Sequence, residues 1–158
     1  MKKSILILTI LTFILSACKK DEDKTPTSSN NPSFSMKVNG SSYVDDGTAE
    51  GLFIKNLNTN VSSNALDQKS SITVYFEANA IGTYTVGQGS HGASYISYGL
   101  SGTDTTYYAQ SGSITVSEYD TAGHQISGTF NLVVRNASNG KSINLTEGKF
   151  ENLSLTEF

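Results

Sequence analysis

Short runs of alternating apolar and polar residues constrain this chain of 158 residues more than any other feature. The runs recur about every ten residues, and Gly, Asn or Asp separates them. No longer stretch carries the 3.6-residue period of an amphipathic helix. An alternating run gives a strand one apolar and one polar face. The pattern therefore predicts an all-β domain of about nine or ten short strands.

The apolar members of each run identify the side that we expect to face the core. These rows are Phe34/Met36/Val38, Leu52/Ile54, Ile72/Val74/Phe76, Tyr84/Val86, Ile96/Tyr98/Leu100, Ile114/Val116, Ile126/Gly128/Phe130/Leu132/Val134, Ile143/Leu145, Phe150 and Leu153/Leu155. Tyr43-Val44 opens the strand that returns after Asn39-Gly40, and Tyr107-Tyr108 marks a further strand.

Turn residues predict how the strands connect. Asn39-Gly40 is a strong signal for a two-residue hairpin, because both central positions of that turn need positive φ. Residues 120–124 and 136–140 have the composition of hairpin loops. Phe150 and Leu153 fall on opposite parity, which predicts a β-bulge between them. Hairpin-connected antiparallel strands of this kind form a β-sandwich or a flattened barrel, and the pattern leaves both open.

The first 17 residues have the pattern of an export signal. Lys2 and Lys3 precede an apolar run over residues 5–15, and small residues follow it. A membrane-spanning helix needs about 20 apolar residues, so this run is too short to remain as an anchor. We therefore expect residues 1–17 to be cleaved.

Leu15-Ser16-Ala17-Cys18 resembles the lipobox of bacterial lipoproteins. That resemblance implies that Cys18, the only cysteine, is acylated and becomes the first residue of the mature chain. Two or three acyl chains hold a protein stably on a membrane without a protein helix. The alternative is an ordinary secretory signal with a cysteine near its end by chance.

Residues 18–32 predict a disordered tether, and residues 33–158 a single domain. The tether is charged, then rich in Ser, Thr, Asn and Pro, and it lacks apolar residues that could join a core. Asp21, Glu22 and Asp23 resemble the sorting signal of surface-exposed lipoproteins in Bacteroidota-type bacteria. This resemblance implies the outer membrane, and the alternative is a solvated linker.

Charge argues against nucleic acid as a partner. The chain has a formal net charge of −3, and Arg135 is its single arginine. Binding to phosphates needs a basic cluster, which is absent from the sequence. The membrane, reached through the lipid, is the one partner that the sequence indicates.

No motif points firmly to catalysis, a cofactor or a metal. Gly87–Gly92 matches G-x-G-x-x-G, but a strand pattern follows it where dinucleotide binding needs a helix. His91 and His124 are the only histidines, and two histidines in separate turns are too few for a zinc site. Asp45-Asp46-Gly47 with Glu50 lacks the spacing of a calcium loop and is better interpreted as a turn.

Two further residue sets are candidates for surface roles. Asp104-Thr105-Thr106 and Asp120-Thr121-Ala122 match the short O-glycosylation pattern of Bacteroidota-type bacteria, which makes Thr105 and Thr121 candidate acceptors. Exposed tyrosines on a sheet can stack on sugars or contact a protein, although tyrosine is also an ordinary strand residue. The tyrosines considered are Tyr75, Tyr95, Tyr98, Tyr107, Tyr108 and Tyr119.

Over residues 1–155 the chain resembles small uncharacterised lipoproteins of Bacteroidota-type bacteria. The likeness depends on the lipobox and on Phe34–Gly40, Gly82–Val86, Ser111–Val116, Ile126–Phe130 and Glu147–Phe150. It implies a location and a fold but no activity.

We expect a lipid-anchored envelope protein with a non-catalytic β domain that binds a ligand, glycan or partner protein. The alternative is a surface hydrolase, which would need two neighbouring carboxylates. A third hypothesis is a structural subunit whose edge strand pairs with another sheet. The acids considered for the hydrolase are Asp67, Glu77, Glu118, Asp120 and Glu147.

Overall fold

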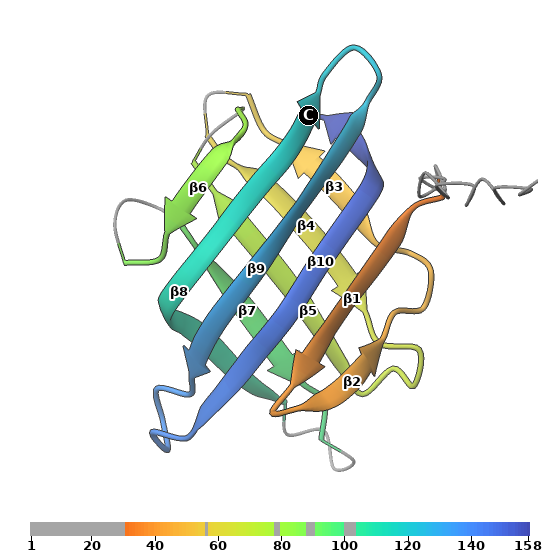
Figure 1. Ribbon diagram of the computed structural model, residues 1–158. Coiled ribbons are helices and arrows are strands. Elements are labelled where there is room, and N and C mark those ends of the chain that lie inside the picture. The colour runs from red at the N-terminus through yellow and green to blue at the C-terminus, as the bar shows by residue number, and fades with distance from the viewer. Residues whose placement is uncertain (1–30, 56, 78–79, 88–90, 100–103) are drawn as a thin grey trace, which may run out of the picture.

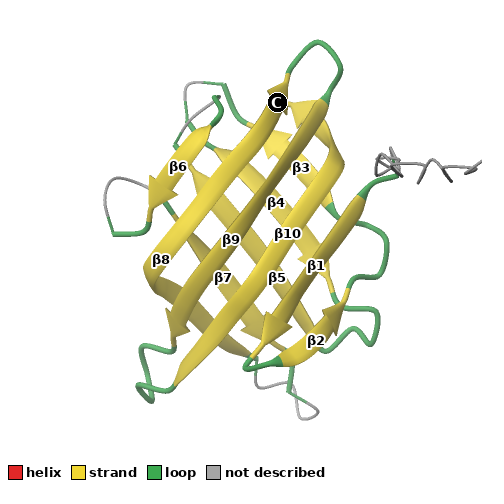
Figure 2. Cartoon of the chain, viewed as in Figure 1, coloured by secondary structure: helices red, strands yellow, loops and turns green. Residues whose placement is uncertain are grey.

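The computed structural model describes residues 31–55, 57–77, 80–87, 91–99 and 104–158. These residues form strands joined by turns and loops, which confirms the all-β prediction (Figures 1 and 2). Among them, no helix is long and apolar enough to cross a membrane. The strands are β1 (Ser33–Val38), β2 (Ser41–Val44), β3 (Glu50–Phe53), β4 (Thr59–Asn64), β5 (Ser70–Phe76), β6 (Gly82–Thr85), β7 (Gly92–Ser97), β8 (Thr105–Asp120), β9 (Gln125–Arg135) and β10 (Ser142–Glu157).

Seven of the strands close a barrel in the order β3-β4-β5-β7-β8-β9-β10, so the barrel alternative is the one that the chain adopts. The barrel has two layers, with β8, β9 and β10 in front and β3, β4, β5 and β7 behind (Figure 1). The β1–β2 hairpin extends the front layer beyond β10, and β6 extends it beyond β8. All pairs are antiparallel except β10 with β3, which run parallel over residues 155–157 and 51–53.

The predicted turns lie where the sequence placed them. Asn39 and Gly40 have φ values of 49° and 84°, and Val38 pairs with Ser41 across this two-residue turn. Residues 121–124 connect β8 to β9, and residues 136–141 connect β9 to β10. The register shifts between Phe150 and Leu153, and Asn152 has a φ of 50°, which confirms the predicted bulge.

Bulges let the long strands β8 and β10 bend, so that each pairs with strands of both the front and the back layer. Side chains of β9 satisfy the backbone groups that two bulges of β10 leave unpaired. Asn131 Oδ1 accepts a hydrogen bond from Glu147 N at 3.0 Å, and Ser127 Oγ accepts one from Asn152 N at 3.0 Å. Ser127 also donates to Glu118 Oε2 at 2.8 Å, which connects the neighbouring bulge of β8.

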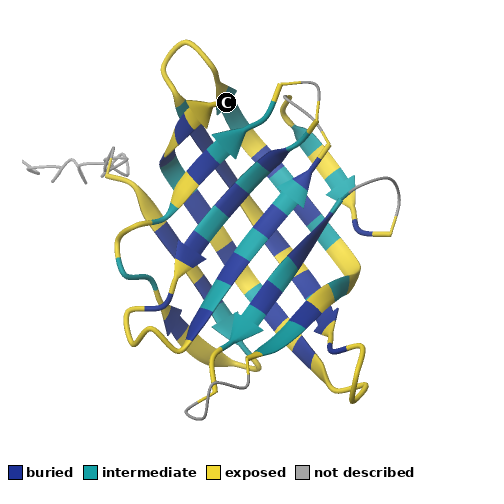
Figure 3. Ribbon diagram, turned by 180° about the vertical axis from the view of Figure 1, so that it is seen from behind, coloured by how far each residue is buried: buried dark blue, intermediate teal, exposed yellow. Residues whose placement is uncertain are grey.

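The core fills the barrel interior, and burial alternates along the strands (Figure 3). Ile72, Val74 and Phe76 of β5 are 1%, 0% and 0% exposed, as their predicted row requires. Ile114 and Val116 of β8 are also fully buried.

Two rows that were predicted to face the core do not do so. In β3 the interior side carries Gly51 and Phe53 rather than Leu52. A Cβ on Gly51 would lie 2.9 Å from Ile126 Cγ2, so the barrel has room there only for glycine. In β7 the interior side carries Ala93 and Tyr95, whereas Ile96 is half-buried and Tyr98 is exposed. Leu100, predicted in the same row, lies outside the described residues.

Two glycine–phenylalanine pairs join β9 and β10. Gly128 stands opposite Phe150, and Gly148 stands opposite Phe130. An added Cβ would lie 2.5 Å from Phe150 Cζ in the first pair and 2.5 Å from Phe130 Cζ in the second. Each ring therefore occupies the space that a side chain on its partner would need.

Candidate functional site

A half-open pocket lies between the β1–β2 hairpin and the turn that joins β4 to β5. Its volume is about 390 Å³, within the range of small-molecule sites. β2 forms one wall, the β4–β5 turn another, and Tyr95 of β7 contributes from the barrel interior. The lining residues are Val38, Ser41, Ser42, Tyr43, Val44, Ala65, Leu66, Asp67, Ser70 and Tyr95.

Local sequence explains why these elements meet. The Asn39-Gly40 turn sends β2 back along β1, and strand alternation directs Tyr43 inward and Val44 outward. Val44 O then accepts a hydrogen bond from Leu66 N at 2.8 Å, which attaches the end of β2 to the β4–β5 turn. Within that turn Ala65 N donates to Ser70 O at 2.9 Å.

A hydrogen-bonded group fixes Tyr43 on one side of the pocket. Its hydroxyl donates to the carbonyl oxygen of Ser63 at 3.0 Å. The Ser63 hydroxyl lies 3.2 Å from the Tyr43 hydroxyl and donates to Asp45 Oδ1 at 2.5 Å. Burial raises the pKa of Tyr43 well above its ordinary value, and the negative charge of Asp45 raises it further. Tyr43 is therefore a neutral phenol whose oxygen can still accept a hydrogen bond.

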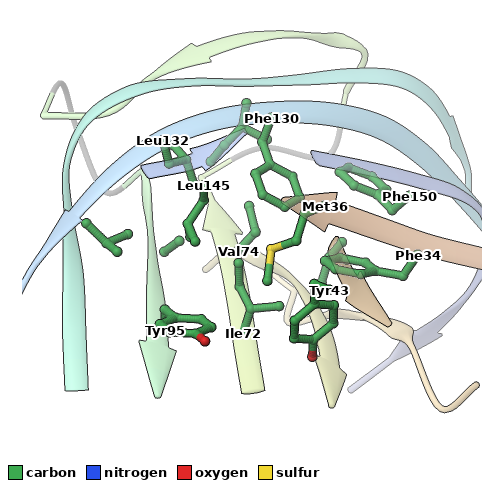
Figure 4. Close-up of a cluster of buried hydrophobic side chains, with 14 of the residues drawn as sticks. Phe34, Met36, Tyr43, Ile72, Val74, Tyr95, Phe130, Leu132, Leu145 and Phe150 are labelled. Carbon is green, nitrogen blue, oxygen red and sulfur yellow. The ribbon is translucent and has the colours of Figure 1, made fainter. Parts of the chain in front are cut away.

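Tyr95 and Ser70 carry the most informative groups of the pocket. Tyr95 is 7% exposed and Ser70 is 8% exposed, and both line the pocket. Within the described part of the chain, neither side-chain hydroxyl has a hydrogen-bond partner, yet neither is sealed from the pocket. Figure 4 shows Tyr95 and Tyr43 on either side of Ile72. Nearly buried hydroxyls are normally paired, so these two are available to a ligand.

The rim of the pocket combines apolar and acidic character. Val44 is 58% exposed and Leu66 is 63% exposed, and the two are adjacent. Asp67 Oδ2 lies 3.7 Å from Lys69 Nζ in an exposed ion pair. Of the described residues that line the pocket, none is Lys, Arg or His. Such a pocket offers hydroxyls, a carboxylate and apolar surface to a ligand, and the Lys69 ammonium beside it is paired with Asp67 rather than part of the lining.

The residues predicted for membrane attachment and modification do not belong to this pocket. Cys18 and the acidic run Asp21, Glu22 and Asp23 lie outside the described residues. Thr121 is exposed in the loop between β8 and β9. Thr105 is half-buried at the start of β8, where it pairs with Ser97. Of the two candidate acceptors, Thr121 is therefore the more accessible.

The structure places the two histidines in different surroundings. His91 Nδ1 accepts a hydrogen bond from Glu77 N at 3.1 Å, and its ring lies 5.1 Å from the Tyr84 ring. His124 lies in the β8–β9 loop, and its carbonyl oxygen accepts from Leu155 N at 2.9 Å. In the described ranges no three His, Cys, Asp or Glu residues are grouped to hold a metal.

The two short motifs considered in the sequence, the Asp45-Asp46-Gly47 motif and the glycine-rich motif Gly87–Gly92, contain residues with local structural roles. Asp45 Oδ2 and Asp46 Oδ1 accept backbone hydrogen bonds from Gly47 and Thr48, as in a turn. Gly92, the last residue of the glycine-rich motif, begins strand β7.

The tyrosines divide into buried and exposed members. Tyr95 and Tyr107 are buried with ring centroids 6.1 Å apart, whereas Tyr98 is 39% exposed and Tyr108 is 52% exposed. Tyr119 packs edge-on against Phe53, 6.2 Å away. Tyr75 is half-buried in β5.

The acids considered for hydrolysis have separate partners. Asp67 faces Lys69, Glu147 binds Lys37 at 2.7 Å, and Glu118 binds Ser127. Asp120 Oδ1 accepts hydrogen bonds from the backbone of its own loop at 2.8 and 2.9 Å. Glu77 is exposed at the end of β5.

Sequence reasoning listed Tyr95 among the tyrosines but missed Ser70, Ser41 and Ser42. Serine is so frequent in this chain that no single serine stands out. The Asn39-Gly40 turn was the one signal for this pocket in the sequence, because it predicts that β2 pairs with β1. The sequence does not show that β2 also contacts the β4–β5 turn.

Comparison with known protein families gives one match. A family model described as a domain of unknown function, DUF6252, matches residues 30–154. No curated protein and no solved structure matches the chain.

Proposed function

We propose that this chain, which belongs to the DUF6252 family of domains of unknown function, is a lipid-anchored envelope protein whose barrel binds a small neutral ligand. The ligand occupies the pocket between β2 and the β4–β5 turn. The observation that carries the binding proposal is the pair of nearly buried, unpartnered hydroxyls on Tyr95 and Ser70. A ligand that exchanges hydrogen bonds with them would supply the partners that these two hydroxyls lack within the described residues.

The composition of the pocket supports a sugar ring as the ligand class. A sugar presents hydroxyls around its edge and C–H groups on its faces, which suit the serine and tyrosine hydroxyls and the apolar rim. The absence of Lys, Arg and His among the described lining residues disfavours phosphates and carboxylates. Tyr43 supports binding rather than chemistry, because its raised pKa keeps the phenol protonated and leaves no phenolate to act as a base at neutral pH.

The direction of β1 supports attachment through Cys18. β1 begins at Ser33 and ends at Val38, which lines the pocket. The proposed tether therefore enters the folded domain at Ser33, the start of β1 (Figure 1), whereas the pocket extends along β2 from Ser41, opposite Val38, to Val44, opposite Ser35. A lipid on Cys18 would hold the domain through this point and not through a residue that lines the pocket. The acidic residues after Cys18 support placement in the outer membrane on the resemblance stated above.

Binding is tested with the purified domain and a panel of neutral hexoses and N-acetylhexosamines. We expect saturation-transfer NMR to detect binding, and titration calorimetry to show that Tyr95→Phe and Ser70→Ala each weaken it by about two- to tenfold, the value of one neutral hydrogen bond. Tyr108→Phe, which removes an exposed hydroxyl outside the pocket, is the matched control and leaves affinity unchanged. Sugar binding that neither pocket variant weakens, or no binding to any sugar, contradicts the proposal.

A further inference from the structure

The outer face of the back layer is uncharged over a wide area. Strands β4, β5 and β7 contain no Asp, Glu, Lys or Arg, and neither does β8 over residues 105–117. These segments are neighbours, because β5 pairs with β4 and β7, and β7 pairs with β8. On either side charges return, with Glu50 of β3 opposite Ser62 and Arg135 of β9 opposite Tyr108. We call the outward side chains of β4, β5, β7 and residues 105–108, together with Tyr98, the tyrosine face, which is turned toward the viewer in Figure 3.

The outer face of the front layer differs in charge. There Lys37 of β1 binds Glu147 of β10 at 2.7 Å, and Lys149 binds Glu151 at 2.7 Å. Charged side chains of both signs are what keeps an ordinary exposed surface soluble. Their absence from the tyrosine face therefore favours an uncharged partner there.

Two of the tyrosines on this face are held against the sheet. A Cβ on Gly92 would lie 2.6 Å from the Tyr75 hydroxyl oxygen, so the end of the Tyr75 ring covers the backbone of β7. The Tyr98 hydroxyl lies 3.0 Å from Ser71 Oγ of β5, and Tyr98 remains 39% exposed. Tyr108 is 52% exposed. Rings held in this way give the C–H faces of sugar rings a surface to pack on, with little further loss of side-chain entropy.

Hydroxyl groups lie between these rings. Thr73 of β5 is opposite Ser94 of β7, and Ser94 is opposite Tyr108 of β8. Within the described part of the chain, the side-chain hydroxyls of Ser94, Tyr75 and Tyr108 have no hydrogen-bond partner. A hydroxyl both donates and accepts, so it can pair with a sugar hydroxyl in either direction. The face therefore matches a neutral sugar chain and offers no cation to a phosphate, sulfate or carboxylate.

A second copy of the chain fits this face less well. At about 4.8 Å per strand and 3.3 Å per residue, the face measures roughly 20 Å by 20 Å, or about 400 Å². A stable dimer buries about 800 Å² per partner around an apolar centre. Of the described residues on the tyrosine face, Ile96 is the one aliphatic side chain, and it is already half-buried. The face is therefore too small and too polar for the core of a dimer.

From these observations we infer that the tyrosine face binds a neutral polysaccharide chain, at a site separate from the pocket. Tyr75, Tyr98 and Tyr108 pack on the faces of the sugar rings, and the hydroxyls between them bind the ring edges. Strand alternation separates the two sites, because Tyr95 and Ser70 point into the barrel and the tyrosine face points outward. The inference does not rest on the proposed ligand of the pocket.

Native gel electrophoresis in gels that contain a soluble polysaccharide tests the inference. The neutral probes are starch, hydroxyethyl cellulose and glycol chitin, and alginate is the acidic comparison. We expect at least one neutral polymer to retard the purified wild-type domain and alginate not to retard it.

A charge placed on the face gives the decisive variant. Thr73→Glu puts a carboxylate where a bound chain would remove it from water, so retardation should weaken about tenfold or more. Thr129→Glu is the matched control, because it makes the same change of net charge on the outer face of β9, opposite Lys149. It should bind like the wild type.

A second pair of variants tests the aromatic contribution. Tyr98→Ala removes a ring and should weaken retardation by about two- to tenfold, whereas Tyr98→Phe keeps the ring and should keep most of the affinity. Tyr95→Phe, in the pocket, should leave retardation unchanged. Thermal unfolding of every variant verifies that the barrel is intact.

The results distinguish this site from the pocket and from a self-interface. Retardation that Tyr95→Phe weakens and Thr73→Glu leaves unchanged would assign the polymer to the pocket and overturn the inference. A wild-type dimer that Thr73→Glu converts to a monomer in sedimentation, without any polysaccharide binding, would assign the face to a second copy and also overturn it. Failure of every neutral polymer to retard the wild type overturns it as well, and the calorimetry with one-ring sugars still judges the pocket by itself.

Discussion

At the scale of single residues, Tyr43 is held in the core by both its hydroxyl and its ring. Its hydroxyl donates to the Ser63 carbonyl, and its ring lies 6.0 Å from the Phe34 ring in an edge-on contact. Burial favours the neutral phenol, so its pKa is raised in the folded state from the ordinary value of 10.0. Tyr43 therefore couples the stability of the fold to alkaline pH.

We predict that Tyr43 loses its stabilising effect in alkali. A raised folded-state pKa means that the stabilisation is complete below pH about 10 and is lost as the pH rises toward the folded-state value, because the unfolded chain ionises first. Urea unfolding of the wild type and Tyr43→Phe at pH 8 and above pH 10 measures this. At pH 8 the variant should be about 1 kcal/mol less stable, since the Ser63 carbonyl loses its donor. The deficit should shrink above pH 10, and a deficit independent of pH contradicts the assignment.

Two single residues, Tyr95 and Ser70, explain why the ligand pocket could not be predicted from the sequence. Tyr95 and Ser70 are ordinary strand residues in composition. Their hydroxyls become informative only because the register of β7 on β5 and the attachment of β2 to Leu66 leave them nearly buried and unpaired. Alternation within a strand predicts which side a residue faces, not which other strand it meets.

At the scale of strands, alternation predicted most of the fold. It placed the core residues of β5, β8 and β9 correctly because each interior row there holds large apolar side chains or a glycine covered by a ring. It failed in β3 and β7, where Gly51 and Ala93 face the interior and larger apolar residues lie on the other side. The interior is closely packed at those two positions, so only a small residue fits there.

The glycine–phenylalanine pairs between β9 and β10 give a prediction at this scale. Gly128→Ala forces its Cβ against the Thr115 carbonyl oxygen and into the Phe150 ring, and we expect a loss of about 1–3 kcal/mol in the free energy of unfolding. Gly82→Ala is the matched control in β6, since its nearest atoms are 3.5 and 3.7 Å away on the Tyr84 side chain. Chemical denaturation of both variants measures the difference, and equal stabilities contradict the packing argument.

At the scale of the whole molecule, the proposed anchor reaches the folded domain through the start of β1, at Ser33. A tether of residues 18–32 reaches at most about 50 Å when extended, at 3.3–3.6 Å per residue. An acylated Cys18 would therefore keep the barrel within that distance of the bilayer.

We predict that Cys18→Ser releases the protein from the membrane, because no acyl chain can then be attached through sulfur. Cell fractionation with immunoblotting measures the shift from the membrane pellet to the soluble fraction, and mass spectrometry of the wild type should show an acylated N-terminal cysteine. Ser28→Ala, a matched change in the tether, should stay in the pellet. Membrane association of the Cys18 variant at the wild-type level refutes the anchor.

The parallel pairing of β10 with β3 has a consequence for how the ring is completed. Residues 155–157 pair with residues 51–53, so the contact that closes the barrel joins two segments that are far apart in the chain. Until residue 157 has emerged, β3 has only β4 beside it, and the cylinder remains an open sheet. Closure therefore has to wait for residues 155–157, and it brings together segments far apart in the chain at a high loop-closure cost.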